Sequence, residues 1–283
     1  MVQSLLLQLL FEWQGLGMAV VVGAFGEISF EIYCPSLQRS EDYRHGASEP
    51  YYWQEASTSF GKILAALQRA GFKTGYRVMD ASNYGVPQRR ARLFLIGTKG
   101  DVKPWGWPQQ CKFRSRDFEA DILDPMVSSD CIRRLPSKDH KYENKEPNRE
   151  RRQVKRTIKK LKIKAKNVFP SNVEKAKVLY NVLLRRCVVD VGSSLRYGST
   201  AVGCFGTLTK TRLQHGKYWM CGRGRYISIS EMFKAFGILE SEVDWQGAGL
   251  SKQSMGAMLG NSMSLPLTEL LLEEALRVIG YLA

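Results

Sequence analysis

The clearest pattern of apolar and polar residues in this chain lies between residues 57 and 97. Residues 57–70 repeat apolar side chains at helical spacing, which predicts an amphipathic helix. A strand is expected next, through Tyr76 and Val78. The unbroken apolar run 93–96, closed by Gly97, predicts a second strand that is buried on both faces of a parallel sheet. This order of elements indicates an α/β fold.

A charged segment stands between the two predicted strands. Gln88, Arg90 and Arg92 alternate in sequence, so their side chains would share one face if the chain enters the strand here. Two guanidinium groups at the mouth of a strand can hold a phosphate, a carboxylate or a base carbonyl through paired hydrogen bonds. An ion-pair network at the edge of a sheet would account for the same pattern. The residues alone leave both interpretations open.

Two helix starts are marked near the end of the chain. Ser228 and Glu231 have the spacing of a capping box, in which each side chain satisfies a free backbone donor, and Gly237 is placed to end that helix. Ser264 and Pro266 suit the cap and the first turn of another helix. The leucine-rich stripe that follows is typical of a helix that packs on a core.

The chain is strongly basic, and much of the excess charge is local. It contains 42 Lys and Arg against 27 Asp and Glu, a formal net charge of +15, which favours polyanionic partners. Ten of the eighteen residues 149–166 are Lys or Arg. Such a run attracts phosphates independently of base sequence, and we expect Lys155, Arg156, Lys159 and Lys160 to contact the phosphates of a nucleic acid. A solvated helix face, a disordered insert and a nuclear-import signal are the alternatives.

Other classes of protein find little support. The six cysteines show no Cys-x-x-Cys spacing and there are three histidines, so we expect neither a disulfide framework nor a metal site. The apolar run 5–10 is soon interrupted by Glu12 and Gln14, so a signal peptide or membrane span is not expected. We expect reduced thiols and a location in the nucleus of a eukaryote, or otherwise in the cytoplasm.

Four segments, in one order, resemble signatures of the DNA (cytosine-5) methyltransferases. Residues 83–92, Asn-Tyr-Gly-Val-Pro-Gln-Arg-Arg-Ala-Arg, match that family's Tyr-Gly-Val-Pro-Gln-x-Arg-x-Arg before an apolar strand. Residues 206–209 are similar to its Pro-Thr-Leu-Thr. Residues 225–231 are similar to its Arg-x-Leu-Thr-x-x-Glu, and 236–238 stand where it usually has Gln-Gly-Phe. Residues 259–263 resemble its closing Gly-Asn-Ser/Ala-Val.

The resemblance implies a role for several residues. Arg92 would face a cytosine flipped out of the duplex, and Arg90 the active-site loop or a DNA phosphate. Asn261 and Ser262 would contact the cofactor S-adenosylmethionine. The partner would be double-stranded DNA. A supporting role in the fold falls to Gln88, Arg225, Ser228 and Glu231.

The resemblance also implies a fold and its divisions. We expect part of a Rossmann-like methyltransferase sheet with an inserted, irregular target-recognition domain. Residues 1–56 form a divergent N-terminal segment, and 57–100 the late part of the sheet domain. Residues 101–222 form the target-recognition region with its basic insert, which approaches the major groove, and 223–283 return to the sheet domain.

Several parts of the family pattern are missing. The family's nucleophile is the cysteine of a Pro-Cys dipeptide, and no proline here is followed by cysteine. Its cofactor loop, Phe-x-Gly-x-Gly, is absent, and residues 20–26 are a faint imitation. Its Glu-Asn-Val segment is absent too, with Glu31 in Phe30-Glu31-Ile32 as a candidate remnant.

These departures bear on catalysis. Cytosine C5 is a poor nucleophile until a thiolate adds at C6, after which it can attack the methyl group of S-adenosylmethionine. We therefore expect a family member that is incomplete and inactive alone. There are three possible explanations. The first, which the divergent N-terminal segment favours, is a truncated or misassembled gene. The others are a split enzyme with a complementary N-terminal half and a DNA-binding or regulatory module without catalysis. An RNA-directed member is a further alternative.

Overall fold

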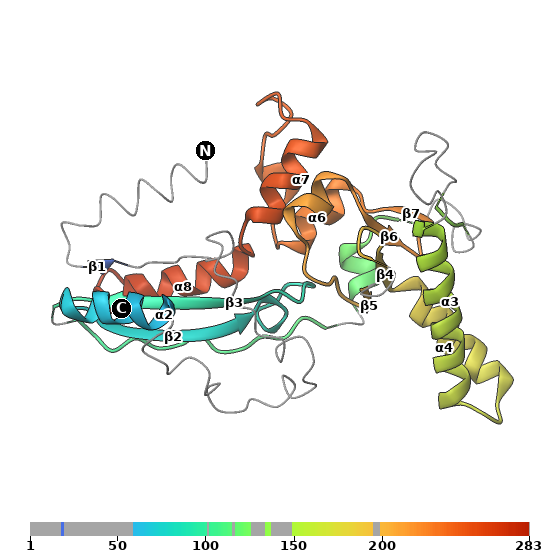
Figure 1. Cartoon of the computed structure of the whole chain (residues 1–283), viewed down its shortest axis with the longest axis horizontal. Helices are drawn as coiled ribbons and strands as arrows, with labels where there is room; N and C mark the ends of the chain where they lie inside the picture. The colour runs from blue at the N-terminus through green and yellow to red at the C-terminus, as the bar shows by residue number, and fades with distance from the viewer. Residues whose placement is uncertain are drawn as a thin grey trace. The chain divides into compact units, whose positions relative to one another are not determined.

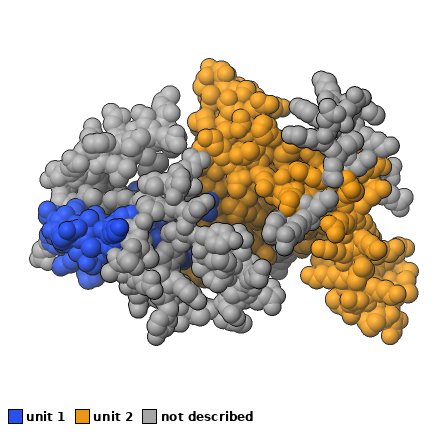
Figure 2. Space-filling model, in the orientation of Figure 1, with its two compact units in different colours: residues 1–79, 92–107, 272–283 blue, residues 80–91, 108–271 orange. Residues whose placement is uncertain are grey.

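The computed structural model describes residues 18–19, 59–100, 102–114, 117–125, 134–136, 149–194 and 199–282. By its contacts the chain divides into two compact units, shown in Figure 2. Unit 1 contains residues 1–79, 92–107 and 272–283, and unit 2 contains residues 80–91 and 108–271. The boundaries predicted near 57, 101 and 223 follow the family's organisation and stay predictions.

Unit 1 is built on a small sheet of order β1-β3-β2 (Figure 1). Its elements are α2 (Ser59–Arg69), β1 (Met18–Ala19), β2 (Lys73–Asp80) and β3 (Ala91–Thr98). The predicted amphipathic helix and both predicted strands are therefore confirmed. The helix ends before Gly71, whose φ of 85° is readily adopted only by glycine.

A parallel sheet was predicted for unit 1, and this prediction is wrong. β1 pairs with β3 in antiparallel register. The Thr98 hydroxyl, at the end of β3, donates to the carbonyl of Lys73 at the start of β2, 3.4 Å away, so these two strands also run in opposite directions. The ten residues 81–90 that join them are shorter than the crossover that a parallel pair needs.

The alternating charged segment enters the strand later than predicted. β3 begins at Ala91, so Arg92 lies in the strand while Gln88 and Arg90 precede it. The carboxylate of Asp80 accepts hydrogen bonds from the backbone and hydroxyl of Ser82 and from the backbone of Arg90. These bonds fold residues 81–90 into a turn that begins with η4 (Ala81–Asn83), and the expectation of one shared strand face is wrong.

Unit 2 contains a four-stranded antiparallel sheet of order β5-β4-β6-β7. The strands are β4 (Cys187–Asp190), β5 (Thr200–Val202), β6 (Tyr218–Met220) and β7 (Arg225–Tyr226). Helices α3 (Arg149–Val168) and α4 (Val173–Arg185) form a hairpin beside it (Figure 1). The irregular structure expected from residue 101 to 222 is thus wrong for this part: strands of two to four residues carry too little alternation to be seen in the sequence.

The remaining elements of unit 2 are short helices. They are η5 (Phe118–Ile122), α5 (Lys210–Gln214), α6 (Ile229–Ala235), η7 (Glu240–Glu242) and α7 (Lys252–Asn261). Helix α8 (Leu265–Val278) begins in unit 2, directly after Ser264 and with Pro266 in its first turn, as predicted, and its last residues belong to unit 1.

The four-stranded sheet separates two apolar clusters, because successive side chains of a strand point to opposite faces. Val188 and Met220 belong to the larger cluster, with residues of α5, α6 and α7. Val189 and Trp219, their neighbours in sequence, belong to the second cluster, with residues of α3 and α4. The basic helix and the family segments around α5 to α7 therefore pack on opposite faces of one sheet.

The capping box at Ser228 and Glu231 is present as predicted, and Gly237 follows the end of α6 with a φ of 72°. Glu231 is fully buried. Its carboxylate accepts two hydrogen bonds of 2.9 Å from the guanidinium of Arg225, and others from the backbone N–H groups of Ser228 and Asp124. One charged side chain thus fixes the start of α6 and joins it to β7 and to residue 124.

Asp124 extends this network. Its carboxylate accepts from the Ser228 hydroxyl and lies 3.4 Å from the ammonium of Lys234. Burial raises the pKa of Asp124, but the Ser228 and Lys234 contacts outweigh it and hold the pKa below the usual value. The carboxylate is therefore charged at neutral pH.

Within the described residues, no helix is long and apolar enough to span a membrane. The same residues contain no group of three or more His, Cys, Asp or Glu side chains that could hold a metal ion. Their cysteines, Cys111, Cys187, Cys204 and Cys221, are free thiols.

The buried carboxylate of Glu231 gives a test of this framework. Glu231→Gln should lower the free energy of unfolding by about 3 kcal/mol, because Arg225 and two backbone donors lose a charged acceptor inside the protein. Urea denaturation measures the change. Glu242→Gln, at an exposed position of η7, should change stability by less than about 0.5 kcal/mol. Equal effects of the two substitutions would contradict the assignment.

Candidate functional site

The side chain of Arg90 is the point at which the family-like segments meet. It is 5% exposed. One terminal nitrogen donates to the carbonyl of Leu208 at 2.6 Å and the other to the carbonyl of Gly260 at 3.0 Å. Its guanidinium lies over the ring of Phe236, 5.6 Å from the centroid. We call Arg90, Leu208, Phe236 and Gly260 the Arg90 junction.

Backbone and side-chain bonds strengthen the junction on the side of Leu208. The backbone N–H of Arg89 donates to the carbonyl of Phe205, and that of Phe205 to the carbonyl of Pro87. The hydroxyl of Thr207 donates to the carbonyl of Arg89 at 3.0 Å. The two segments therefore run side by side as a short parallel pairing, which includes a bridge between Gln88 and Phe205.

Two glycines allow the closing segment to reach the junction. A Cβ at Gly260 would lie 2.4 Å from the Cα of Lys210, and one at Gly256 would lie 2.6 Å from the carbonyl of Leu213. Both positions on α7 thus require glycine, because the backbone of α5 passes directly beside them. This approach brings the Gly260 carbonyl within reach of Arg90.

Arg90 was expected at an active-site loop or a DNA phosphate. In the structure both of its terminal nitrogens donate to buried carbonyls, an arrangement that favours a supporting role. Gln88, expected to support the fold, is fully buried, and neither its amide oxygen nor its amide nitrogen has a hydrogen-bond partner in the described part of the chain.

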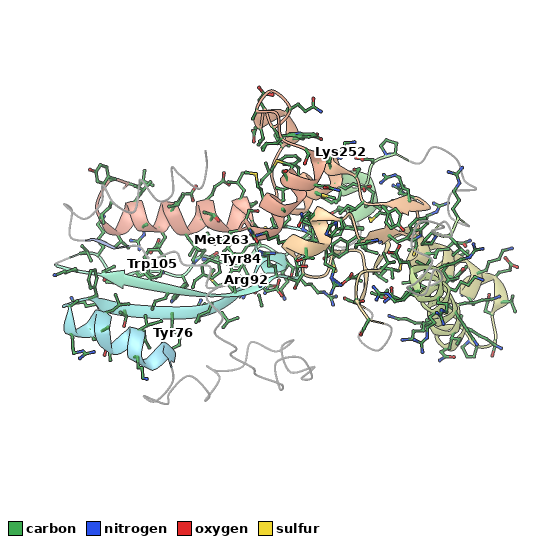
Figure 3. The ribbon with its side chains drawn as sticks, turned by 45° about the horizontal axis from the view of Figure 1, so that its top comes forward. Tyr76, Tyr84, Arg92, Trp105, Lys252 and Met263 are labelled. Carbon is green, nitrogen blue, oxygen red and sulfur yellow. The ribbon has the colours of Figure 1, made fainter. Side chains whose placement is uncertain are left out.

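Arg92 belongs to unit 1, where it is the second residue of β3 and half-buried (Figure 3). The apolar residues that follow it, Phe94, Leu95 and Ile96, are almost completely buried and anchor the strand. The contact of Arg92 with a cytosine stays a prediction.

Asn261 and Ser262, the predicted cofactor residues, lie where α7 ends. Asn261 is exposed. The Ser262 hydroxyl donates back to the carbonyl of Leu259 at 2.7 Å, so it closes the helix and has no proton left for a ligand. With one exposed amide and no glycine-rich loop, the described residues do not form a site for S-adenosylmethionine by themselves.

The four predicted DNA contacts all lie on α3 and are exposed. They are Lys155, Arg156, Lys159 and Lys160. The apolar side of this helix packs on the second cluster, so the interpretation of the basic run as a disordered insert is wrong. The run is a solvated helix face, which is compatible with binding to phosphates.

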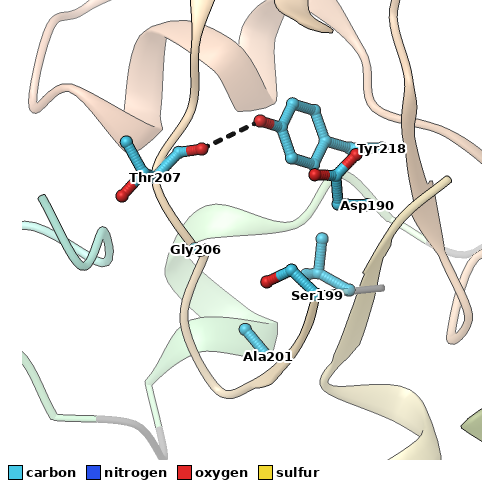
Figure 4. Close-up of a pocket in the computed structure, with 7 residues that line it drawn as sticks. Asp190, Ser199, Ala201, Gly206, Thr207 and Tyr218 are labelled. Atoms are coloured by element: carbon cyan, nitrogen blue, oxygen red, sulfur yellow. Dashed lines mark hydrogen bonds between the residues drawn. The ribbon is translucent and has the colours of Figure 1, made fainter. Parts of the chain in front are cut away.

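A small hollow lies beside the sheet of unit 2, lined by residues that include Asp190, Ser199, Thr207 and Tyr218 (Figure 4). The Tyr218 hydroxyl donates to the Thr207 carbonyl at 3.0 Å. Burial, and then the nearby charge of Asp190, raise the pKa of Tyr218 to about 12. Burial also raises the pKa of Asp190, despite its ion pair with Arg212. Tyr218 is thus paired with Thr207, and Asp190 with Arg212.

Three of the four described thiols have environments that do not suit the family's nucleophile, and the fourth, Cys111, is exposed. Burial raises the pKa of Cys204, outweighing the nearby charge of Arg89, and Cys187 and Cys221 are almost completely buried. A hydrogen bond with the thiol of Cys221, and then burial, raise the pKa of Cys187 strongly. A thiol becomes a nucleophile as the thiolate, so these environments oppose that role.

Two residues that build the junction are not among the predicted site residues, although each has a local signal in the sequence. An Asp side chain often accepts a hydrogen bond from the backbone N–H two residues later. Asp80 does so from Ser82, and it also accepts from the backbone of Arg90, which holds the turn that carries this arginine. Phe236 was seen only as an imperfect match to a motif, although it supplies the ring beneath the Arg90 guanidinium. The distant carbonyls of Leu208 and Gly260 have no signature in the sequence.

Comparisons with known proteins agree with the family that the motifs indicate. A family model described as C-5 cytosine-specific DNA methylase matches residues 54–277. The type II methyltransferase M.AplI of Arthrospira platensis is 40% identical over 48 residues, or 17% of this chain and 13% of that protein. M.BsuFI of Bacillus subtilis is 43% identical over 44 residues, or 16% of this chain and 11% of that protein. The aligned segments thus span a small part of these relatives.

Among solved structures, the Dnmt2 methyltransferase of S. pombe is similar to 80% of this chain and 65% of its own, with 11% sequence identity and a TM-score of 0.43. The family model extends from before α2 to the last turn of α8 and includes the whole Arg90 junction. Since it covers well over half of the sequence, the chain belongs to the C-5 cytosine-specific DNA methylase family.

Proposed function

We propose that this chain supplies the DNA-binding and base-recognition half of a DNA (cytosine-5) methyltransferase and does not transfer a methyl group alone. One observation carries the proposal: Arg90 holds three family segments together through buried contacts, while no proline in the 283 residues is followed by cysteine. The framework around the site is kept although the nucleophile's motif is missing.

The parts of the proposed enzyme divide between two polypeptides. This chain contributes Arg92 toward an extruded cytosine, the basic face of α3 toward phosphates, and Asn261 toward the edge of the cofactor site. A complementary half contributes the thiolate, the glycine-rich cofactor loop and the remaining strands of a doubly wound sheet, to which β2 and β3 belong. When bound, S-adenosylmethionine supplies the methyl group.

Arg92 has a chemical role in this proposal. As cytosine is attacked at C6, negative charge develops in its ring, and a guanidinium beside O2 stabilises that charge without losing its own proton. The residue would thus act more strongly on the transition state than on the bound duplex. Arg90, held by carbonyls, would keep the junction in place.

A module that binds DNA without catalysis is the second candidate. The basic face of α3 favours it, since that face needs neither cofactor nor thiolate to bind phosphates. An RNA-directed member would use the same charges, so comparison of duplex DNA with tRNA as the substrate distinguishes it.

Complementation separates the two candidates. The purified chain, incubated with labelled S-adenosylmethionine and a cytosine-containing duplex, should transfer no methyl group. Addition of the N-terminal half of a related methyltransferase, itself inactive, should restore transfer to the DNA. Binding of the duplex without transfer in the mixture would support the module instead, and transfer by the chain alone would contradict the proposal.

Substitution of Arg92 tests its assigned role. In the complemented mixture, Arg92→Ala should lower turnover by about 100-fold and weaken duplex binding by less than about threefold, because its contact forms mainly in the transition state. Arg77→Ala, an exposed arginine of β2 that stacks on Trp107, serves as the control and should leave both quantities nearly unchanged. Equal losses of turnover and binding in Arg92→Ala would show that the arginine is wrongly assigned.

A further inference from the structure

The apolar side of α3 is already occupied. Its buried residues form one stripe that packs on the second cluster, against residues of α4, β4 and β6; they are Gln153, Val154, Thr157, Leu161 and Ala165. A basic amphipathic helix often binds a membrane surface or a protein groove through its apolar side. Here that side is buried in unit 2, so a partner of α3 must be recognised by the opposite, charged side.

The charged side carries a regular row of lysines. Lys155, Lys159, Lys162 and Lys166 are spaced by four, three and four residues, which places them on one face of the helix. All four are exposed, and no ion pair is found for them within the described residues. We call these four residues the lysine row.

Other lysines of the same helix point elsewhere. At about 100° per residue, Lys160 and Lys164 are turned by roughly 130° and 170° from the middle of the lysine row. Both are exposed as well. Arg152 and Arg156, which are also exposed, stand between the two groups, at roughly 50° and 90° from the middle of the row. The basic residues therefore form one band around the helix, and Lys160, which the sequence grouped with Lys155 and Lys159, lies toward the end of that band away from the lysine row.

Polar contacts fix the rotation of α3 about its own axis. The Gln153 amide donates to the Ser193 carbonyl at 2.7 Å, and the hydroxyls of Thr157 and Thr200 lie 3.1 Å apart. Glu150, in the first turn, accepts hydrogen bonds from the Lys217 ammonium at 2.7 Å and from the Tyr226 hydroxyl. The four-stranded sheet and the loop after β4 thus hold the helix so that the lysine row faces one direction.

The length of the lysine row matches a short stretch of duplex. Lys155 and Lys166 are eleven residue steps apart, or about 16 Å at 1.5 Å per residue. One strand of DNA has a phosphate for every 3.4 Å of helix axis, so it carries about five phosphates over that length. The hairpin of α3 and α4 projects from the rest of unit 2 (Figure 1), and all four lysines of the row are exposed.

If the chain binds DNA as proposed above, we infer that the lysine row of Lys155, Lys159, Lys162 and Lys166 lies along one phosphate backbone of the duplex for about five base pairs. Lys160 and Lys164 face away from the DNA. Because the row contacts phosphates and not base edges, it adds affinity without sequence preference and sets the position of the neighbouring sheet on the duplex.

Two charge-matched variants of the whole chain test this placement. Lys159→Gln with Lys166→Gln removes two charges from the lysine row, and Lys160→Gln with Lys164→Gln removes two from the part of the helix turned away from the row. Binding to a fluorescent duplex is measured by anisotropy between about 50 and 200 mM salt. Circular dichroism checks that α3 stays helical in both.

The first variant should lose about two units of the slope of log K against log salt, near 0.9 for each phosphate contact, and at least about tenfold in affinity at low salt. The second should keep the slope of the unmodified chain within about half a unit. Equal slopes in the two variants, with binding by the unmodified chain intact, would overturn the placement of the row and leave the proposed DNA binding standing. If the unmodified chain binds tRNA but not duplex DNA, or binds neither, the result contradicts the proposed function itself and not only the placement of the row.

Discussion

The buried guanidinium of Arg90 is the constraint on which the site depends. A guanidinium keeps its charge in any protein interior, so it must be surrounded by acceptors if it is to be buried. Here two of its nitrogens bond to the carbonyls of Leu208 and Gly260. Loss of the arginine would remove a charged donor from each of these carbonyls. The charge therefore requires residues more than a hundred positions apart to meet.

This requirement extends through the four-stranded sheet to the helix whose lysine row we propose to contact DNA. Leu208 shares the larger cluster with Val188 and Met220 on one face of the sheet. Val189 and Trp219, one residue away in each strand, pack under α3 on the other face. The turn that carries Arg90 and the helix that carries the lysine row are thus placed by opposite sides of the same strands.

Local signals in the sequence predicted part of this structure. The apolar repeat of residues 57–70 became α2, the apolar run 93–96 became the buried end of β3, and the Ser228–Glu231 pair caps α6 as expected. Each depends on residues within a few positions of one another. The family membership also followed from short segments, because their order along the chain is specific.

The rest depends on contacts that the sequence does not mark. Arg90 looked like a strand residue beside Arg92, yet Asp80, ten residues earlier, bonds to its backbone and keeps it in a turn. The sheet of unit 2 has strands too short to show a period of two. The angular separation of the lysine row from Lys160 and Lys164 appears only once α3 is known to be a helix whose buried stripe faces the sheet.

The most direct test of the Arg90 junction compares two neighbouring arginines. Arg90→Leu removes the buried charge, and Arg89→Leu changes an exposed side chain in the same turn. Amide hydrogen exchange and urea denaturation should show, for Arg90→Leu, faster exchange in residues 206–213 and 252–262 and a loss of about 3 to 5 kcal/mol of stability, with little change for Arg89→Leu. Unchanged exchange in both segments of Arg90→Leu would contradict the account.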